Sequence, residues 1–221
     1  MNDLAKKTIS VGSPTSAQDT EKLLLERLQS STTEDDQFRW LLFVVGYYRG
    51  LQRIDAAKAL LQRFLRESQK SEYKAHCHLA LGQIATDEQE LEIALNHFSA
   101  ALGLKPTAKK VEYVLLNNAG YCLNMLGRYT EGERHCRMAL EIDGMRPSAY
   151  RNLGVSLQGQ GNQIGAAWAL VEATKADTSD ERARVLLQNL VASNPEMVVS
   201  NPWIMEGINP LNTKTLESAC V

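Results

Sequence analysis

The sequence predicts an all-α protein built as an α-solenoid, in which antiparallel helix pairs stack in one row. The first observation is an interval: Gly154 follows Gly120 by 34 residues, and periods of about 20 to 50 residues are typical of repeat architectures. The second is that three segments align without a gap when they are superposed on Gly82, Gly120 and Gly154. A chain of this kind grows one unit at a time and needs no internal domain boundary.

Small residues recur at fixed distances after each of these glycines. Two helices that cross closely need small side chains where their backbones approach. We therefore assign the glycine to the first helix of each pair and the later small residues to the second helix. Residues 12 and 19 after the glycine are Ala94, Gly132, Ala166, Ala101, Ala139 and Ala173, and the sixteenth residues are Phe98, Cys136 and Leu170.

This pattern resembles the tetratricopeptide repeat, which reads W-x-x-L-G-x-x-Y, then A-x-x-x-F, then A and P. The resemblance implies a right-handed superhelix of antiparallel helix pairs. Pro106 lies where the family ends its second helix. The positions that hold large residues in the family are only partly kept here. They are His78, Leu116 and Tyr150, four residues before the glycine, and Ala85, Leu123 and Leu157, three residues after it.

The array is expected to cover residues 19–193. Diverged helices occupy 19–67, with either Val45 or Gly46 at the glycine position. Between Gly82 and Gly120 the interval is 38 residues, and the four extra residues would lengthen a first helix by about one turn. The remaining parts are repeats near 75–106, 111–144 and 147–178, and a capping helix at 180–193 with Asp180 as its N-cap.

The two flanking segments differ in composition from the array. Residues 1–18 have few large apolar side chains and are expected to be loose. Residues 194–221 contain three Asn-Pro steps, which favour an irregular backbone, but they also carry many large apolar residues. We expect this tail to fold back onto the array, on the capping helix or in the groove, with Trp203 as its anchor. Docking on a second copy would give self-association through the tail.

Charge and hydropathy exclude several classes. The chain has 24 basic and 26 acidic residues, a net charge of −2, which gives no general basis for binding nucleic acid through phosphate neutralisation. No run of residues is long and apolar enough to span a bilayer, and the N-terminus lacks the apolar core of a secretion signal. We expect a cytoplasmic protein with no membrane or nucleic-acid partner.

The sequence gives no catalytic, cofactor or metal site. His76, Cys77 and His78 are adjacent, but neighbours on a helix do not face one ion. His97 and His135 both lie fifteen residues after a repeat glycine and are expected on the surface. The cysteines within the array are expected to be buried free thiols. We predict that the protein is not an enzyme.

The resemblance also implies where a partner binds. In tetratricopeptide proteins the first helices line a concave groove that receives a peptide or a helix of another protein. Asn118 and Asn152 are the main candidates, because an amide group holds a peptide backbone through both donors and an acceptor; the alternative is that they bond a neighbouring helix. The full set of groove positions carried over is Gln83, Asn117, Asn118, Tyr121, Arg151 and Asn152.

The sequence thus predicts a non-catalytic module that binds a protein or peptide partner. Two alternatives remain at this stage. One is a tetratricopeptide-type chaperone for exported bacterial proteins. The other, of a different class, is a helical enzyme or nucleic-acid binder whose site has no recognised pattern.

Overall fold

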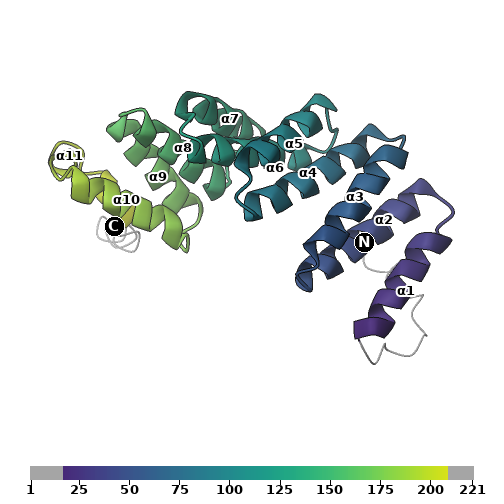
Figure 1. Ribbon diagram of the computed structural model, residues 1–221. Helices are drawn as coiled ribbons and strands as arrows, with labels where there is room; N and C mark the ends of the chain where they lie inside the picture. Colours follow the sequence, from purple (N-terminus) through teal and green to yellow (C-terminus); the bar gives the residue numbers. More distant parts are fainter. Residues whose placement is uncertain (1–16, 209–221) are drawn as a thin grey trace, which may run out of the picture. The chain divides into compact units, whose positions relative to one another are not determined.

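The computed structural model describes residues 17–208, and every regular element in that range is an α-helix (Figure 1). The predicted all-α solenoid is confirmed. Across the described helices, none combines the length and the apolar character that crossing a membrane requires. The helices are α1 (Ala17–Ser30), α2 (Glu34–Gly50), α3 (Ile54–Glu67), α4 (Ser71–Asp87), α5 (Leu91–Gly103), α6 (Lys109–Met125), α7 (Tyr129–Ile142), α8 (Pro147–Gly159), α9 (Gln163–Ala176), α10 (Glu181–Ser193), α11 (Glu196–Ser200) and α12 (Ile204–Ile208).

The chain forms two compact units, residues 1–68 and residues 69–221. Sequence analysis treats the array as one unit, whereas the structure divides it after α3. In a solenoid each repeat contacts only its neighbours, so no central core joins all the helices. The segment expected to be loose, 1–18, lies outside the described residues except for its last two, which begin α1.

In the first unit, α1 packs on α2, and α2 pairs with α3. The carboxylate of Glu21 on α1 accepts hydrogen bonds from the Tyr48 hydroxyl, at 2.9 Å, and from the Arg53 guanidinium, at 2.6 Å. The Arg53 hydrogen bond holds the pKa of Glu21 below its ordinary value. One carboxylate therefore joins α1 to both ends of the turn between α2 and α3.

The position of the first pair within the repeat pattern is settled by its turn. The seventh residue after the repeat glycine has a positive φ in each of the three regular pairs: Gln89 at 64°, Gly127 at 73° and Gly161 at 80°. Gln52 has a φ of 58° and follows Val45 by seven residues. Val45 is buried and Gly46 is exposed, so Val45 takes the glycine position.

In the second unit the repeat glycines mark the closest approach between paired helices. A Cβ atom on Gly82 would lie 2.5 Å from the Phe98 ring, and one on Gly154 would lie 2.8 Å from Cγ of Leu170. Real Cβ atoms do not approach so closely. The residue sixteen positions later therefore packs directly on the glycine, and a larger first-helix residue would separate α4 from α5 or α8 from α9.

The four-residue insertion before Gly120 lengthens the first helix α6, as expected, but α6 begins at Lys109 and not at Thr107. α4 and α6 have 17 residues each and α8 has 13. The carboxylate of Glu72, in the first turn of α4, accepts hydrogen bonds from the backbone N–H of Thr107, at 2.8 Å, and from its hydroxyl, at 3.0 Å. The first turn of α4 is thereby fixed to the segment that leads into α6.

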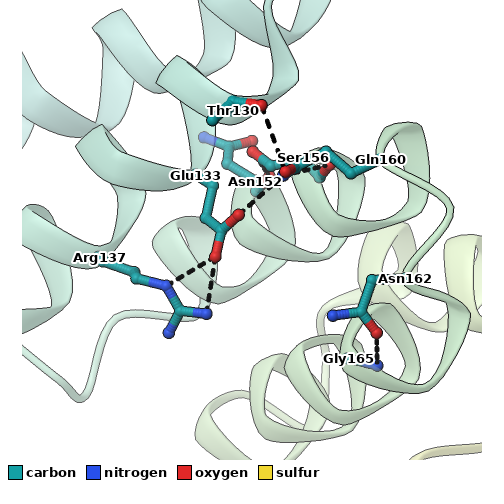
Figure 2. A network of polar contacts seen from close by, with 8 residues as sticks. All are labelled: Thr130, Glu133, Arg137, Asn152, Ser156, Gln160, Asn162 and Gly165. Carbon is teal, nitrogen blue, oxygen red and sulfur yellow. Dashed lines mark hydrogen bonds and ion pairs between the residues drawn. The ribbon is translucent and has the colours of Figure 1, made fainter.

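Polar side chains join α7 to α8 (Figure 2). Gln160 donates from Nε2 to the Glu133 carboxylate, at 2.8 Å, and accepts from the Thr130 hydroxyl, at 3.3 Å. Glu133 also pairs with Arg137, one turn along α7. The Glu133 pKa is held below its ordinary value chiefly by the Gln160 hydrogen bond. At the next turn Asn162 caps α9 by accepting from the backbone N–H of Gly165.

The C-terminal tail is more regular than expected, because residues 194–208 contain the two five-residue helices α11 and α12. α12 packs on α9 and α10. Ile204 is fully buried there, whereas Trp203 is only partly buried, so Ile204 and not Trp203 is the anchor. A Cβ atom on Gly207 would lie 2.7 Å from Leu187. The remainder of the tail, 209–221, lies outside the described residues.

Two buried residues of the tail lie at repeat positions. Residue 188 is 34 positions after Gly154, and counting from it places Ile204 sixteenth and Gly207 nineteenth. These are the positions of Leu170 and Ala173 in the preceding pair. Two contact positions of a second helix are thus repeated after α10, although Pro195, the seventh residue in this count, has a φ of −63° and not the positive φ of the regular turns.

Candidate partner-binding pocket

A pocket of about 600 Å³ lies in the second unit, between the first helices α6 and α8 and the helix α10. Pockets of about 300 to 1,000 Å³ are typical of ligand sites. Its walls combine side-chain amides with apolar groups. The lining residues are Asn117, Asn118, Tyr121, Asn124, Met125, Arg151, Asn152, Val155, Glu181, Arg182, Val185 and Leu186.

Five of the six groove positions predicted from the sequence line this pocket: Asn117, Asn118, Tyr121, Arg151 and Asn152. Gln83, on α4, does not line it. The structure thus brings together the predicted residues of α6 and α8. Their role in binding a partner stays a prediction.

Asn152 is held by its neighbours on α6. Its side chain is buried, and its Nδ2 donates to the Oδ1 of Asn117, at 3.1 Å, and to the Asn117 backbone carbonyl, at 3.3 Å. Asn124 donates from Nδ2 to the Asn152 carbonyl, at 2.8 Å, and accepts from the Ser156 hydroxyl, at 2.7 Å. These hydrogen bonds join α6 to α8, which is the structural alternative that sequence analysis had left open for Asn152.

Asn118 is in a different situation. It is half-buried, and its Oδ1 accepts a long hydrogen bond of 3.4 Å from Asn117. Among the described residues, none accepts a hydrogen bond from the Asn118 Nδ2 group. This amide therefore presents two donors to the pocket, and a carbonyl oxygen of a ligand backbone suits them.

Arg151 is tied to the start of α10. Its guanidinium forms an ion pair with the carboxylate of Asp180, which is buried. The other oxygen of that carboxylate accepts from the backbone N–H of Ala183, at 3.0 Å, so the predicted N-cap Asp180 is confirmed. The charge of Arg151 is thus already balanced within the protein.

Sequence analysis missed the α10 wall, which consists of Glu181, Arg182, Val185 and Leu186. It treated α10 as a cap because Gln188 stands at the glycine position. The signal in the sequence that could have identified this wall was the spacing of the small and apolar residues on α10. Ala183, Leu187 and Leu190 are buried and lie at the same offsets from residue 188 as Ala149, Leu153 and Ser156 do from Gly154.

A second polar pair lies away from the pocket, between α4 and α5. The Nδ1 atoms of His78 and His97 are 3.0 Å apart, and both rings are half-buried. The surface position predicted for His97 is therefore wrong, because positions 4 before and 15 after the glycine face each other across the pair. Burial lowers the pKa of both rings.

The cysteines at 77, 122 and 136 are free and buried, as predicted. Burial raises the pKa of Cys77 and of Cys136 to about 12, which leaves both thiols protonated at neutral pH. Within residues 17–208, no three His, Cys, Asp or Glu side chains gather in a way that would hold a metal ion.

No protein-family model matches the chain. A segment of 118 residues, 50% of this chain, is 32% identical to an uncharacterised TPR repeat-containing protein of Arabidopsis thaliana, where TPR stands for tetratricopeptide repeat. The match spans 14% of the length of that relative.

Solved structures with the same fold include MamA from Desulfovibrio magneticus RS-1. Its TM-score is 0.61 at 15% identity, with 80% of this chain and 97% of that chain covered. The Cut9–Hcn1 hetero-tetramer of the APC/C also matches, with a TM-score of 0.61 at 20% identity, and the match covers 69% of this chain and 29% of that one. At these identities the similarity shows the fold.

Proposed function

Since this chain carries tetratricopeptide repeats, we propose that it is a non-catalytic protein-interaction module that binds a peptide or helix of a partner protein in the pocket between α6, α8 and α10. The observation that carries this proposal is the pocket itself. It lies on three successive first helices of the stack and combines apolar walls with an unused amide.

Two further observations support a binding role. Met125 and Val185 are 53% and 42% exposed on the pocket walls, and apolar groups in a concave surface are typical of sites that another molecule covers. Cut9, which shares the fold, is found in a hetero-tetramer with Hcn1. A protein partner is therefore the class of ligand that the chain is proposed to bind.

Site-specific photocrosslinking tests this function. A benzophenone amino acid is introduced at Asn118 in the full chain, and the protein is irradiated in an extract of the source cells. The matched control carries the same amino acid at Asn96, which is exposed on α5 outside the pocket. We expect a discrete protein adduct from position 118 that is absent from position 96. The same adducts from both positions would show that the pocket does not bind the partner.

A further inference from the structure

We infer that the pocket takes an uncharged apolar segment of a partner protein, with a leucine, methionine or phenylalanine side chain in the pocket, and not an acidic motif or a free C-terminal carboxylate. This inference rests on the proposed function and adds the chemistry of the ligand. It depends on the charges, the apolar walls and the amide donors that the pocket presents.

The charges around the pocket are mostly balanced by partners within the chain. Arg151 forms an ion pair with the buried carboxylate of Asp180. Glu181 forms one with Arg184. Arg182 forms no ion pair with any described residue, but it is exposed at the solvent-facing rim, where a single charge contributes little to binding. An acidic ligand would therefore have to displace Asp180 or rely on Arg182 alone.

The walls of the pocket are apolar and come from all three helices. Tyr121 and Met125 belong to α6, Val155 belongs to α8, and Val185 and Leu186 belong to α10. These side chains already lie in a concave surface, so an apolar side chain that enters it is removed from water on several sides at once. The volume of about 600 Å³ suits one or two large side chains.

The amide of Asn118 supplies the polar part of recognition. Its Nδ2 group has no acceptor among the described residues, whereas the Asn152 Nδ2 group already donates to Asn117. A backbone carbonyl of the ligand meets the Asn118 donors without bringing a charge into the pocket. Backbone bonding together with an apolar anchor defines a peptide segment and not a small ion.

The first test is selection of peptides by the immobilised full chain from a phage-displayed library of random peptides of about twelve residues. We expect enriched peptides to share large apolar residues and to lack Asp and Glu. Two enriched peptides are then synthesised, each with a C-terminal amide and with a free carboxylate, and their affinities are measured by fluorescence anisotropy. The two forms should bind within about twofold of each other, and replacement of the shared apolar residue by alanine should weaken binding at least tenfold.

Matched variants assign the binding to the pocket. Met125→Glu and Val185→Glu place a charge on the pocket walls and should weaken binding at least tenfold. Met145→Glu and Val199→Glu make the same changes at residues that are 78% and 83% exposed and do not line the pocket, and they should leave binding unchanged. Because Met125 is itself exposed, its replacement leaves the core intact, and a melting curve verifies this for each variant.

The salt dependence of binding and the Arg182→Gln variant distinguish an uncharged apolar ligand from an acidic one. A rise in NaCl from about 0.05 M to 0.5 M screens exposed charges. Binding that does not depend on such charges should therefore change in affinity by less than about twofold. Arg182→Gln should weaken binding by less than about twofold, the small effect of one exposed charge. Acidic enriched peptides, a free carboxylate that binds more than about tenfold better than the amide, or loss of binding in Arg182→Gln would overturn the inference while the proposed function stands. No enrichment at all, or equal binding to Met125→Glu and Met145→Glu, would overturn both.

Discussion

The carboxylate of Asp180 does two things at once: one oxygen caps α10, and the other forms an ion pair with Arg151 of α8. The pair is largely shielded, with 7% of the Asp180 side chain and 21% of the Arg151 side chain exposed. It fixes the α10 wall of the pocket to α8. It also determines whether the charge of Arg151 is available to a ligand.

Asp180→Asn separates these roles, because asparagine is also a good N-cap. We expect the free energy of unfolding in urea to fall by about 1.5 to 3 kcal/mol, the scale of a hydrogen bond to a charged group. The variant should also bind acidic peptides better than the parent chain, since Arg151 is then unpaired. Glu131→Gln, which removes the exposed pair with Arg128, is the control and should leave stability within experimental error. Unchanged stability in Asp180→Asn would show that the ion pair does not stabilise the fold.

The two asparagines chosen from the sequence should respond differently to alanine. Asn118→Ala is expected to weaken peptide binding by about 1 kcal/mol, a typical net hydrogen bond, without a change in the melting temperature. Asn152→Ala removes the donor that joins α8 to Asn117 and should lower the free energy of unfolding by about 1 to 3 kcal/mol. Anisotropy titrations and urea unfolding measure the two effects. A loss of binding in Asn152→Ala at full stability would contradict the structural role.

Gly154→Leu should destabilise the second unit by about 1 to 3 kcal/mol through overpacking, because a Cβ atom there already lies 2.8 Å from Leu170. The matched control is Gly103→Leu, at the end of α5, where a Cβ atom meets nothing within 4 Å. Thermal unfolding followed by circular dichroism compares the two. Equal melting temperatures would mean that Gly154 does not lie at the helix contact.

Acid should weaken the contact between α4 and α5. Burial lowers the pKa of both His78 and His97 below the ordinary value of 6.5, so below about pH 6.5 the unfolded chain binds more protons than the folded one, and stability falls as the pH decreases. The contact between the Nδ1 atoms needs one donor and one acceptor, and two protonated rings place two donors face to face.

The double variant His78→Leu, His97→Ala tests this. It copies the residues Leu116 and Ala169 that stand at the same repeat positions. Urea unfolding at about pH 5 and about pH 7.5 should show a smaller difference in stability for the variant than for the parent chain. His76, whose pKa is also lowered by burial, and the carboxylates with lowered pKa values, such as Glu72 and Glu133, contribute to the dependence that remains. An identical difference in both proteins would exclude the histidine pair as its source.

The tail should stabilise the second unit. Ile204→Ala is expected to lower the free energy of unfolding by about 2 to 5 kcal/mol, as for other large core residues, whereas Met205→Ala, at an exposed neighbour, should have little effect. Truncation after Ser193 should lower the melting temperature as well. Since no tail residue up to 208 lines the pocket, truncation after Ser193 should leave peptide affinity unchanged, and a rise in affinity would place a tail segment in the pocket.

Most of the fold was predictable because the repeat contacts are local. One glycine, a small residue twelve positions later and a large one sixteen positions later determine how two helices meet, and all three are visible in the sequence. The burial of Leu41, Val44 and Val45 in the first pair follows from the same spacing. The division after α3 was not predictable, because it depends on packing between pairs and not on the pattern within a pair.

The candidate site was predictable in part. The α6 and α8 positions came from the resemblance to tetratricopeptide proteins, carried over by counting from Gly120 and Gly154, but α10 was missed because Gln188 breaks the pattern at its most recognisable residue. Sequence alone did not separate Asn118 from Asn152, since an amide suits both a ligand and a neighbouring helix, and only the positions of Asn117 and Asn124 decide between them. The histidine pair was missed because two residues nineteen apart meet only once the helix pair is built.

The register that runs from Gln188 through Ile204 to Gly207 bears on how the molecule could be lengthened. The C-terminal segment already carries two contact positions of a second helix, so a graft of α9 residues 163–176 onto positions 197–210 would supply the rest of such a helix. Such a chimaera would present at its new end the same face that α8 and α9 offer to α10. Further 34-residue units could then be appended in phase, and the row of first helices would extend by one with each unit added.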